Sequence, residues 1–151
     1  MTPESDATSI FDGYVEEYEA ACARGVHLSG EDRDYFAAER IKLTASWCSP
    51  RIEVRRIVDF GCGLGHSAPH IVAAFPAATV LGVDTSVRSI DSARRRYGSD
   101  RIDFTADAAA VPRQSIDLVY SNGTFHHIEP PERLDVVKGI RDCLRPGRAR
   151  G

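Results

Sequence analysis

The sequence predicts an α/β protein built on a doubly wound parallel sheet that is incomplete at its C-terminus and preceded by an N-terminal helical cap. After Pro50, short runs rich in β-branched residues alternate with stretches of helical periodicity, as in strands joined by crossover helices. A glycine-rich segment, residues 61–65, connects the first such run to a helical stretch. With 151 residues and 42% hydrophobic content, the chain has the size and composition of one domain around one core.

Residues 1–50 form the expected cap. They hold four basic and ten acidic side chains, a net charge of −6 within a chain of net charge −3. A first helix, ended by Gly25, is predicted from apolar residues that recur every three or four positions: Phe11, Tyr14, Val15, Tyr18 and Cys22. A second helix is predicted from Ser29 to Pro50. Its bulky apolar residues are Phe36, Leu43 and Trp47.

Residues 51–151 form the expected α/β body. Strands are predicted at residues 56–60, 79–83, 101–105 and 115–121. Helices are predicted at residues 66–75, at 87–97 before Gly98, and from Pro130 toward Pro146. One side of the last helix carries Leu134, Val137, Ile140 or Arg141, and Leu144. Ligands of open α/β sheets bind outside the carboxyl ends of the strands, so we expect the site there.

Charge and hydropathy exclude some partners. The 19 basic and 22 acidic side chains argue against a surface that grips nucleic acid. Residues 1–9 have neither a basic nor an apolar leader region, and no later run approaches the roughly 18 apolar residues of a membrane span. We therefore predict a cytoplasmic protein with no nucleic-acid and no membrane partner.

Cysteine and histidine spacing does not indicate a metal site. The four cysteines follow neither a CxxC redox pattern nor a zinc-finger spacing, which favours free buried thiols: Cys22, Cys48, Cys62 and Cys143. His66 and His70 are four residues apart on a predicted helix, but Pro69 lies between them and no third ligand is near. No metal is predicted.

The strongest motif is Asp59-Phe60-Gly61-Cys62-Gly63-Leu64-Gly65, where a strand runs into glycines at alternate positions. Glycine allows a tight turn and close contact between the backbone and a ligand, which favours a loop that holds a nucleoside. A dinucleotide fingerprint would need glycine at position 66, where this chain has His66. The alternative interpretation is that the glycines only make a tight turn.

Asp84 ends the second predicted strand, 23 residues after Gly61. An acid at about this distance takes the ribose hydroxyls in doubly wound folds, because a carboxylate accepts two hydrogen bonds from a vicinal diol. The alternative is that Asp84 caps the following helix, although Ser86 is also available for that role.

From about Ile57 to Gly147 the sequence resembles the class I S-adenosylmethionine-dependent methyltransferases of the small-molecule type, which have a Rossmann-like fold. Residues 59–65 are similar to the first motif of that family, and residues 82–84 to its ribose-binding acid. Asp107-Ala108 resembles the adenine-edge pair, and residues 116–122 resemble the fourth strand. The segment 144–147 is like the one that precedes the family's fifth strand.

This resemblance implies S-adenosyl-L-methionine as cofactor and a small-molecule methyl acceptor. The implied cofactor-binding residues are Asp59, Gly61, Cys62, Gly63, Gly65, Asp84, Thr85, Asp107, Ala108 and Asn122. Tyr14 and Tyr18 resemble the aromatic N-terminal helix that covers the cofactor in small-molecule members; plain core packing is the alternative. Carboxylates suit the cationic groups of this cofactor, and backbone N–H groups suit its carboxylate.

Methyl transfer mainly requires that a nucleophile be aligned and water be excluded, so no dedicated catalytic residue is required. His126 and His127 follow the fourth predicted strand, and a histidine there can remove a proton from a hydroxyl or amine acceptor. We treat both as candidate catalytic residues. The alternative is that they serve packing or the geometry of the loop.

The resembling family has about three further strands after the fourth, whereas this chain stops after the fourth strand and its helix. A fourth strand left at the edge of the sheet favours pairing with a second copy of the chain, so a homo-oligomer is expected. Two other functions remain alternatives: a non-catalytic cofactor-binding or interaction fragment, and a nicotinamide-dependent oxidoreductase, which His66 disfavours.

Overall fold

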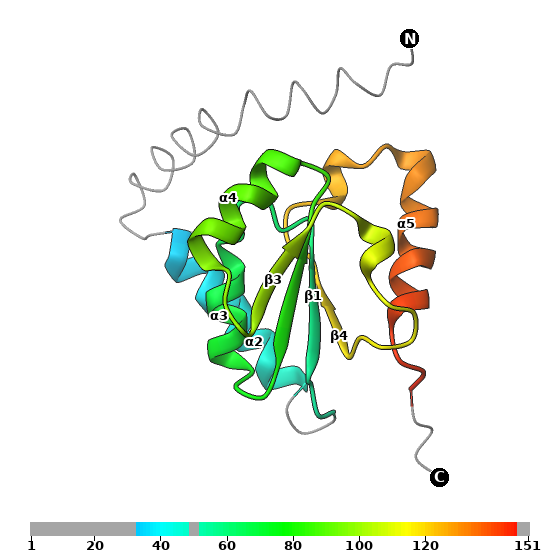
Figure 1. Cartoon of the computed structure of the whole chain (residues 1–151). Helices are drawn as coiled ribbons and strands as arrows, with labels where there is room; N and C mark the ends of the chain where they lie inside the picture. Colours follow the sequence, from blue (N-terminus) through cyan, green and yellow to red (C-terminus); the bar gives the residue numbers. More distant parts are fainter. Residues whose placement is uncertain (1–32, 49–51, 148–151) are drawn as a thin grey trace.

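Four parallel strands form one sheet in the order β3-β2-β1-β4 in the computed structural model, which describes residues 33–48 and 52–147 (Figure 1). The strands are β1 (Arg56–Phe60), β2 (Thr79–Val83), β3 (Ile102–Thr105) and β4 (Leu118–Tyr120). β1 lies inside the sheet between β2 and β4. Because all four strands are parallel, their carboxyl ends meet at one edge of the sheet.

Helices cover both faces of the sheet. On one face lie α2 (Arg33–Cys48), α3 (Ser67–Ala74) and α4 (Val87–Tyr97), and on the other lies α5 (Pro130–Cys143) (Figure 1). Two short 3-10 turns, η1 (Ala108–Ala110) and η2 (Phe125–His127), follow β3 and β4. This arrangement confirms the predicted doubly wound α/β fold.

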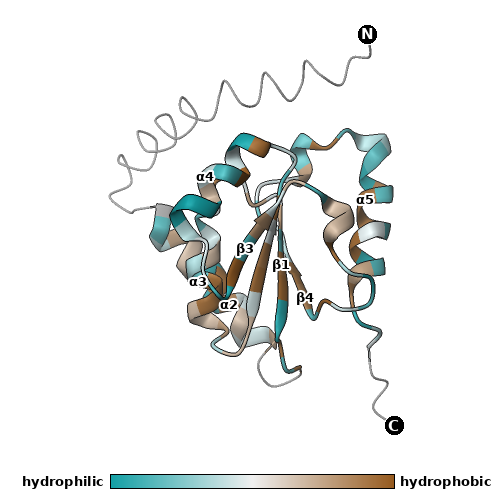
Figure 2. Cartoon of the chain, in the orientation of Figure 1, coloured by the Kyte–Doolittle hydropathy of each residue, from teal (hydrophilic) through white to brown (hydrophobic). Residues whose placement is uncertain are grey.

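Successive side chains of each strand point to opposite faces, and this produces two apolar clusters. Ile57 of β1 belongs to the larger cluster, together with Ile41 of α2 and Ile71 of α3. Val58, the next residue of β1, belongs to the smaller cluster, against which Cys143 at the end of α5 packs. The hydrophobic residues of the strands accordingly lie between the two helical layers (Figure 2).

The boundaries of the elements agree closely with the predictions, except at β4. The predicted strand covers residues 115–121, whereas only Leu118–Tyr120 belong to the ladder with β1. The N–H groups of Ser115 and Ile116 donate to the carbonyl of Cys143, and Ile116 forms an isolated bridge with Leu144. The start of the predicted strand is thus bonded to the end of α5.

The bulky apolar residues of two helices face solvent. In α2 the buried residue is Ile41, whereas Leu43 is 52% exposed and Trp47 is 64% exposed. In α5 the expected apolar side is largely uncovered, and Leu134 is 62% exposed. The residues of α2 that pack on the core recur every three or four positions along one side of the helix: Ile41, Ala45 and Cys48.

Several predictions concern residues 1–32, which lie outside the described residues: the first helix with Tyr14 and Tyr18, and the start of the second helix at Ser29. The division of the chain at residue 50 stays a prediction, and Ile41 of α2 shares one apolar cluster with the sheet. Within residues 33–48 and 52–147, no helix is long and apolar enough to cross a membrane.

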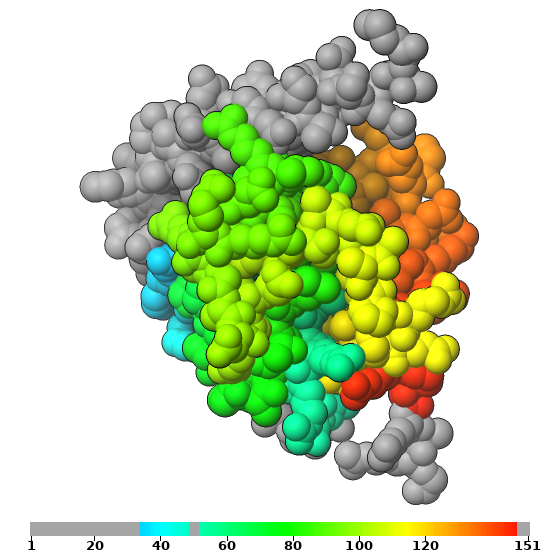
Figure 3. Space-filling model, viewed as in Figure 1, coloured from blue at the N-terminus to red at the C-terminus, as the bar shows by residue number. Residues whose placement is uncertain are grey.

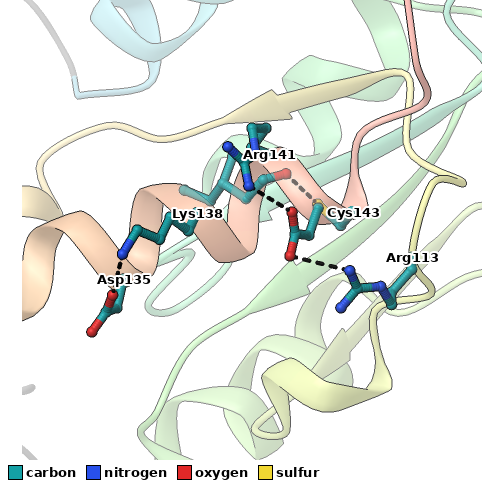
Figure 4. Close-up of polar contacts among 7 residues, drawn as sticks. Arg113, Asp135, Lys138, Arg141 and Cys143 are labelled. Atoms are coloured by element: carbon teal, nitrogen blue, oxygen red, sulfur yellow. Dashed lines mark hydrogen bonds and ion pairs between the residues drawn. The ribbon is translucent and has the colours of Figure 1, made fainter.

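Polar contacts fasten the end of α5 to the segment before β4. Arg113 and Arg141 both bind the carboxylate of Asp142, at 3.2 and 3.3 Å (Figure 4). The backbone carbonyl of Asp142 also accepts from the N–H of Gln114 at 3.0 Å. In the space-filling view the segment before β4, in yellow, lies against the last part of α5 and the chain after it, in red (Figure 3).

Asp117 joins three segments at the amino ends of the strands. One oxygen of its carboxylate accepts from the backbone N–H groups of Arg55 and Arg56, each at 2.9 Å. The other oxygen forms an ion pair with Arg145 at 3.0 Å, and the side chain of Asp117 is only 9% exposed. This carboxylate therefore holds the start of β1, the start of β4 and the chain after α5 together.

We expect Asp117→Ala to lower the free energy of unfolding by about 2–4 kcal/mol, because two N–H groups lose a charged acceptor in a mostly buried place. Asp117→Asn keeps a carbonyl oxygen for these N–H groups and loses only the ion pair, so we expect a loss of about 1 kcal/mol or less. Urea unfolding of both variants measures the difference. Equal losses in the two variants would contradict the assigned backbone contacts.

Candidate functional site

The loop after β1 is held against the end of β2 by backbone hydrogen bonds. The N–H groups of Gly61 and Cys62 donate to the carbonyl of Val83 at 2.7 and 3.1 Å. The N–H of Gly63 then donates to the Asp84 carboxylate at 2.9 Å. The loop and Asp84, which the sequence predicts as parts of one site, thus lie side by side at the carboxyl edge of the sheet.

The three glycines of the loop have different surroundings, although all have positive φ. A Cβ atom on Gly61 would lie 2.1 Å from the hydroxyl oxygen of Thr124, and a Cβ on Gly65 would lie 2.7 Å from the ring of Phe104. A Cβ on Gly63 would meet no atom of the described residues within 4 Å. Gly61 and Gly65 therefore admit the protein's own side chains, and Gly63 faces open space.

The Asp84 carboxylate is half-buried and accepts two backbone hydrogen bonds. Besides the bond from Gly63, its other oxygen accepts from the N–H of Ser86 at 3.0 Å. Ser86 is the N-cap of α4, and its hydroxyl accepts from the N–H of Ser89 at 3.2 Å. Ser86 therefore supplies the helix cap that was the alternative role for Asp84, and each oxygen of Asp84 has a lone pair left for a ligand.

Asp59 is buried, and the neighbouring Tyr120 is half-buried with a buried hydroxyl. They are paired neighbours on β1 and β4, so their side chains point to the same face of the sheet. Asp59 is 3% exposed, and its Oδ2 and the hydroxyl of Tyr120 have no hydrogen-bond partner within the described part of the chain. Such groups are costly to bury unless a ligand or another group satisfies them.

Burial changes the acid–base behaviour of this pair. It raises the pKa of Asp59 from 3.8 to about 7, with a smaller contribution from the negative charge of Asp84. Burial and the neighbouring Asp59 also raise the pKa of the Tyr120 hydroxyl. Burial therefore favours the neutral form of Asp59, and a cation placed beside it would favour the charged form.

Cys62 points away from the open side of the loop. Its Sγ lies 2.9 Å from where a Cβ of Gly82 would be, and its thiol packs against the larger apolar cluster. Burial, and next the negative charge of Asp59, raise the pKa of this thiol. The thiol is therefore neutral at physiological pH, and the polar atoms that Cys62 offers a ligand are those of its backbone.

The predicted adenine-edge residues lie where β3 ends. The Asp107 carboxylate accepts from the N–H of Ala109 at 2.9 Å and caps the short turn η1, in which Ala108 is exposed. Thr85 is exposed beside Asp84 at the end of β2. These three predicted residues are thus at the same edge of the sheet as the loop, and Asp107 keeps one carboxylate oxygen for a further contact.

The candidate catalytic histidines lie on the segment that follows β4. His126 and His127 are exposed in η2, with ring centroids 3.8 Å apart, and Asn122 is exposed before them. Phe125 packs its ring against that of Phe60, with centroids 6.3 Å apart. All three predicted residues of this segment therefore lie at the carboxyl edge of the sheet, near the end of β1.

His66 and His70 lie next to different side chains. The Nδ1 atom of His66 lies 2.9 Å from the hydroxyl of Tyr97, whereas His70 is 3.7 Å from a carboxylate oxygen of Asp34. Among the described residues, no group of three histidine, cysteine or acidic side chains is placed to hold a metal ion.

The chain matches a known protein family. A family described as a methyltransferase domain matches residues 57–147, which are more than half of the chain and include all of the sheet except the first residue of β1. The chain belongs to this family. The predicted resemblance is thereby confirmed, and the order of the four strands of this methyltransferase domain fits the Rossmann-like fold that it implies.

Relatives of this methyltransferase domain have similar sequences over part of their length. The trans-aconitate 2-methyltransferase of Variovorax paradoxus is 33% identical over 99 residues, covering 65% of this chain and 38% of the relative. That of Methylobacterium radiotolerans is 38% identical over 95 residues, covering 62% of this chain and 35% of the relative. The chain thus spans well under half the length of these relatives.

A solved structure supports the fold of the methyltransferase domain. The TehB-like SAM-dependent methyltransferase of Corynebacterium glutamicum superimposes with a TM-score of 0.62 at 20% identity, covering 88% of this chain and 68% of that one. At this identity the likeness concerns the fold.

Two residues of the methyltransferase domain's site were not predicted from sequence: Tyr120 and Thr124. Tyr120 lies in the predicted fourth strand, and only the register between β1 and β4 places it beside Asp59. Thr124 lies 63 residues from Gly61 in sequence, and the fold brings its side chain to that glycine. The signal available for Tyr120 was its hydroxyl directly after the apolar pair Leu118 and Val119. No local signal indicated Thr124.

We expect Asp59→Asn to stabilise the ligand-free chain, and more at pH 8 than at pH 5. The raised pKa means that the stability contributed by protonated Asp59 is fully present below pH 3.8 and is lost as the pH rises to about 7. The neutral amide avoids this loss, which corresponds to a gain on the order of 2–4 kcal/mol at pH 8.

Urea unfolding at the two pH values measures the gain, with Asp100→Asn, an exposed carboxylate, as the control. A gain of the same size at both pH values, or none, would show that Asp59 is not held in its neutral form.

Proposed function

We propose that this methyltransferase domain binds S-adenosylmethionine and serves methyl transfer to a carboxylate group of a small polycarboxylic acid. The observation that carries the proposal is the open space at Gly63, directly beside Asp84, with the unsatisfied pair Asp59 and Tyr120 at the same edge of the sheet. The family match and the four-strand order support it.

The polar groups of the site fit the chemical groups of this cofactor. The buried Asp59 and Tyr120 offer oxygens to a cationic amino group, which would satisfy both and favour ionised Asp59. Asp84 has carboxylate lone pairs for the ribose hydroxyls. The positive end of the α3 dipole follows the loop directly and suits a carboxylate. Asp107 and Ala108 would lie at the adenine edge.

The chain's own contribution is to bind, orient and shield. The bound cofactor supplies an electrophilic methyl group on a sulfonium with a good leaving group. The loop and Asp84 fix the position of the nucleoside, and the segment 121–128 after β4 lies beside the loop, where it would orient an acceptor. Because alignment supplies most of the rate of such a displacement, no proton transfer by a side chain is needed for an acceptor that is already ionised.

Two observations support this acceptor class. The relatives are named trans-aconitate 2-methyltransferases, and two histidines follow β4. A carboxylate is ionised at neutral pH and needs no general base. We therefore propose that His126 and His127 bind the other carboxylates of the acceptor in their cationic form. Their role as a general base for a hydroxyl or amine acceptor is the second candidate.

Three further points of function are proposals as well. The net charge of −3 supports the absence of a nucleic-acid partner. On its outer side β4 has no neighbouring strand among the described residues, which supports pairing with a second copy. A cytoplasmic location stays a prediction from the sequence.

We expect Asp84→Ala to weaken binding of S-adenosylhomocysteine, the demethylated cofactor, by about 1.5–3 kcal/mol, the usual size of hydrogen bonds to a charged group. Gly63→Val should abolish binding, because its side chain would fill the open space and resist the positive φ of this position.

Titration calorimetry measures both effects, with Asp91→Ala, an exposed carboxylate of α4, as the control. Wild-type affinity in Asp84→Ala would remove Asp84 from the site, and wild-type affinity in Gly63→Val would remove the loop.

The cationic role of the histidines predicts that binding of the acceptor depends on pH. If His126 and His127 bind the acceptor as cations, the affinity for trans-aconitate falls as the pH is raised, because a neutral imidazole ring no longer attracts a carboxylate. The affinity is measured by calorimetry in the presence of saturating S-adenosylhomocysteine. Under this condition the amino group of the ligand stays bound to Asp59 at every pH, so a change at Asp59 does not contribute to the result.

In the double variant His126→Gln and His127→Gln we expect weaker binding that no longer depends on pH. The variant His70→Gln, on α3 and away from this segment, serves as the control. Binding that is independent of pH in the wild-type chain would contradict the cationic role.

A further inference from the structure

We infer that Thr124 is a positioning residue, whose side chain occupies the space that Gly61 leaves and thereby fixes the turn carrying His126 and His127 against the loop after β1. The inference rests on the proposed function in that it gives this turn a role at the acceptor. It adds a residue that neither the sequence motifs nor the family match assigns.

Thr124 and Gly61 fit each other closely. The Thr124 hydroxyl donates toward the carbonyls of Phe60 and Gly61, at 3.2 and 3.4 Å. A Cβ on Gly61 would lie 2.1 Å from the hydroxyl oxygen and 2.3 Å from the methyl carbon of Thr124, far inside van der Waals contact. The side chain of Thr124 therefore fills the space beside Gly61 that a larger residue would occupy. The space for a ligand lies at Gly63.

Thr124 is linked to the histidines by the backbone. Its carbonyl accepts from the N–H of His127 at 2.9 Å, which closes the turn η2. Phe125, the next residue, places its ring against that of Phe60. The turn is thus attached to the end of β1 at two adjacent positions, one polar and one aromatic, while Gly123 before it has a positive φ and open space around it.

Thr124 is also linked to the loop after β1, which is proposed to hold the cofactor. The peptide that accepts its hydroxyl belongs to the same short loop whose N–H groups at Gly61 and Cys62 bind Val83. Two residues later, Gly63 binds Asp84. A displacement of the loop on cofactor binding would therefore move the acceptor of the Thr124 hydroxyl, and with it the turn that bears His126 and His127.

Three variants separate the hydroxyl from the shape of Thr124. Thr124→Val keeps the shape and removes the hydroxyl, and Thr124→Ser keeps the hydroxyl. Gly61→Ala places a methyl group in the space that the Thr124 side chain fills. Thr79→Val is the matched control, because the Thr79 hydroxyl also bonds a backbone carbonyl, that of Arg55, at the opposite end of the sheet.

The first measurement is amide hydrogen exchange of the ligand-free chain. We expect exchange at His127 to be about three- to tenfold faster in Thr124→Val, the size of one hydrogen bond, and unchanged in Thr79→Val. Thr124→Ser should restore the slow exchange, and Gly61→Ala should accelerate it at least as much as Thr124→Val. Unchanged exchange at His127 in both Thr124→Val and Gly61→Ala would overturn the inference.

The second measurement is the NMR response of the histidine rings to S-adenosylhomocysteine. In the wild-type chain we expect binding to shift the resonances of His126 and His127. In Thr124→Val the shift should fall by about half or more while the dissociation constant changes less than about threefold, as for the loss of one neutral hydrogen bond. A full shift in Thr124→Val would contradict the inference, as would a loss of affinity as large as that of Asp84→Ala.

The two measurements also separate this inference from the proposed function. If S-adenosylhomocysteine does not bind the wild-type chain, the proposed function fails, and the exchange at His127 still decides whether Thr124 positions the turn. If the ligand binds and exchange is insensitive to Thr124, the proposed function stands and the positioning role falls.

Discussion

The site depends on the parallel register between β1 and β2. Phe60 pairs with Val83, so the two strands end together and the chain leaving β1 meets the carbonyl of Val83 and the carboxylate of Asp84. A register shifted by one residue would send Asp59 and Ile57 to the opposite face and separate Gly63 from Asp84. The apolar cluster around Ile57 opposes such a shift, because it would expose that residue.

The two ends of the sheet each contain a carboxylate, and the two carboxylates have different roles. At the amino ends of the strands, Asp117 satisfies N–H groups of the chain entering β1 and pairs with Arg145, so its carboxylate is fully used within the protein. At the carboxyl ends, Asp59 is more deeply buried and yet has an oxygen without a partner in the described part of the chain. One carboxylate stabilises the fold, whereas the other costs stability and is suited to a ligand.

The glycines divide their work in a comparable way. Gly61 and Gly65 admit Thr124 and Phe104, so that the loop packs closely on the segment after β4 and on β3. Gly63 alone among them adjoins open space. Gly61 and Gly65 therefore allow the close packing that holds the loop in one position, although its residues are small. Gly63 leaves room for a ligand beside the loop.

The sequence by itself determined most local features: the strand and helix boundaries other than those of β4, the glycine spacing and the acid that follows β2. These follow from residue periodicity and from backbone conformations that only certain residues adopt. It did not determine the sides of α2 and α5 that are covered, since Trp47 and Leu134 keep the same helical period whether or not another element packs on them. Tertiary structure alone decided that Tyr120 neighbours Asp59 and that Thr124 fills the space at Gly61. These contacts join residues about 60 positions apart, and no periodicity within one segment encodes a distance between two segments.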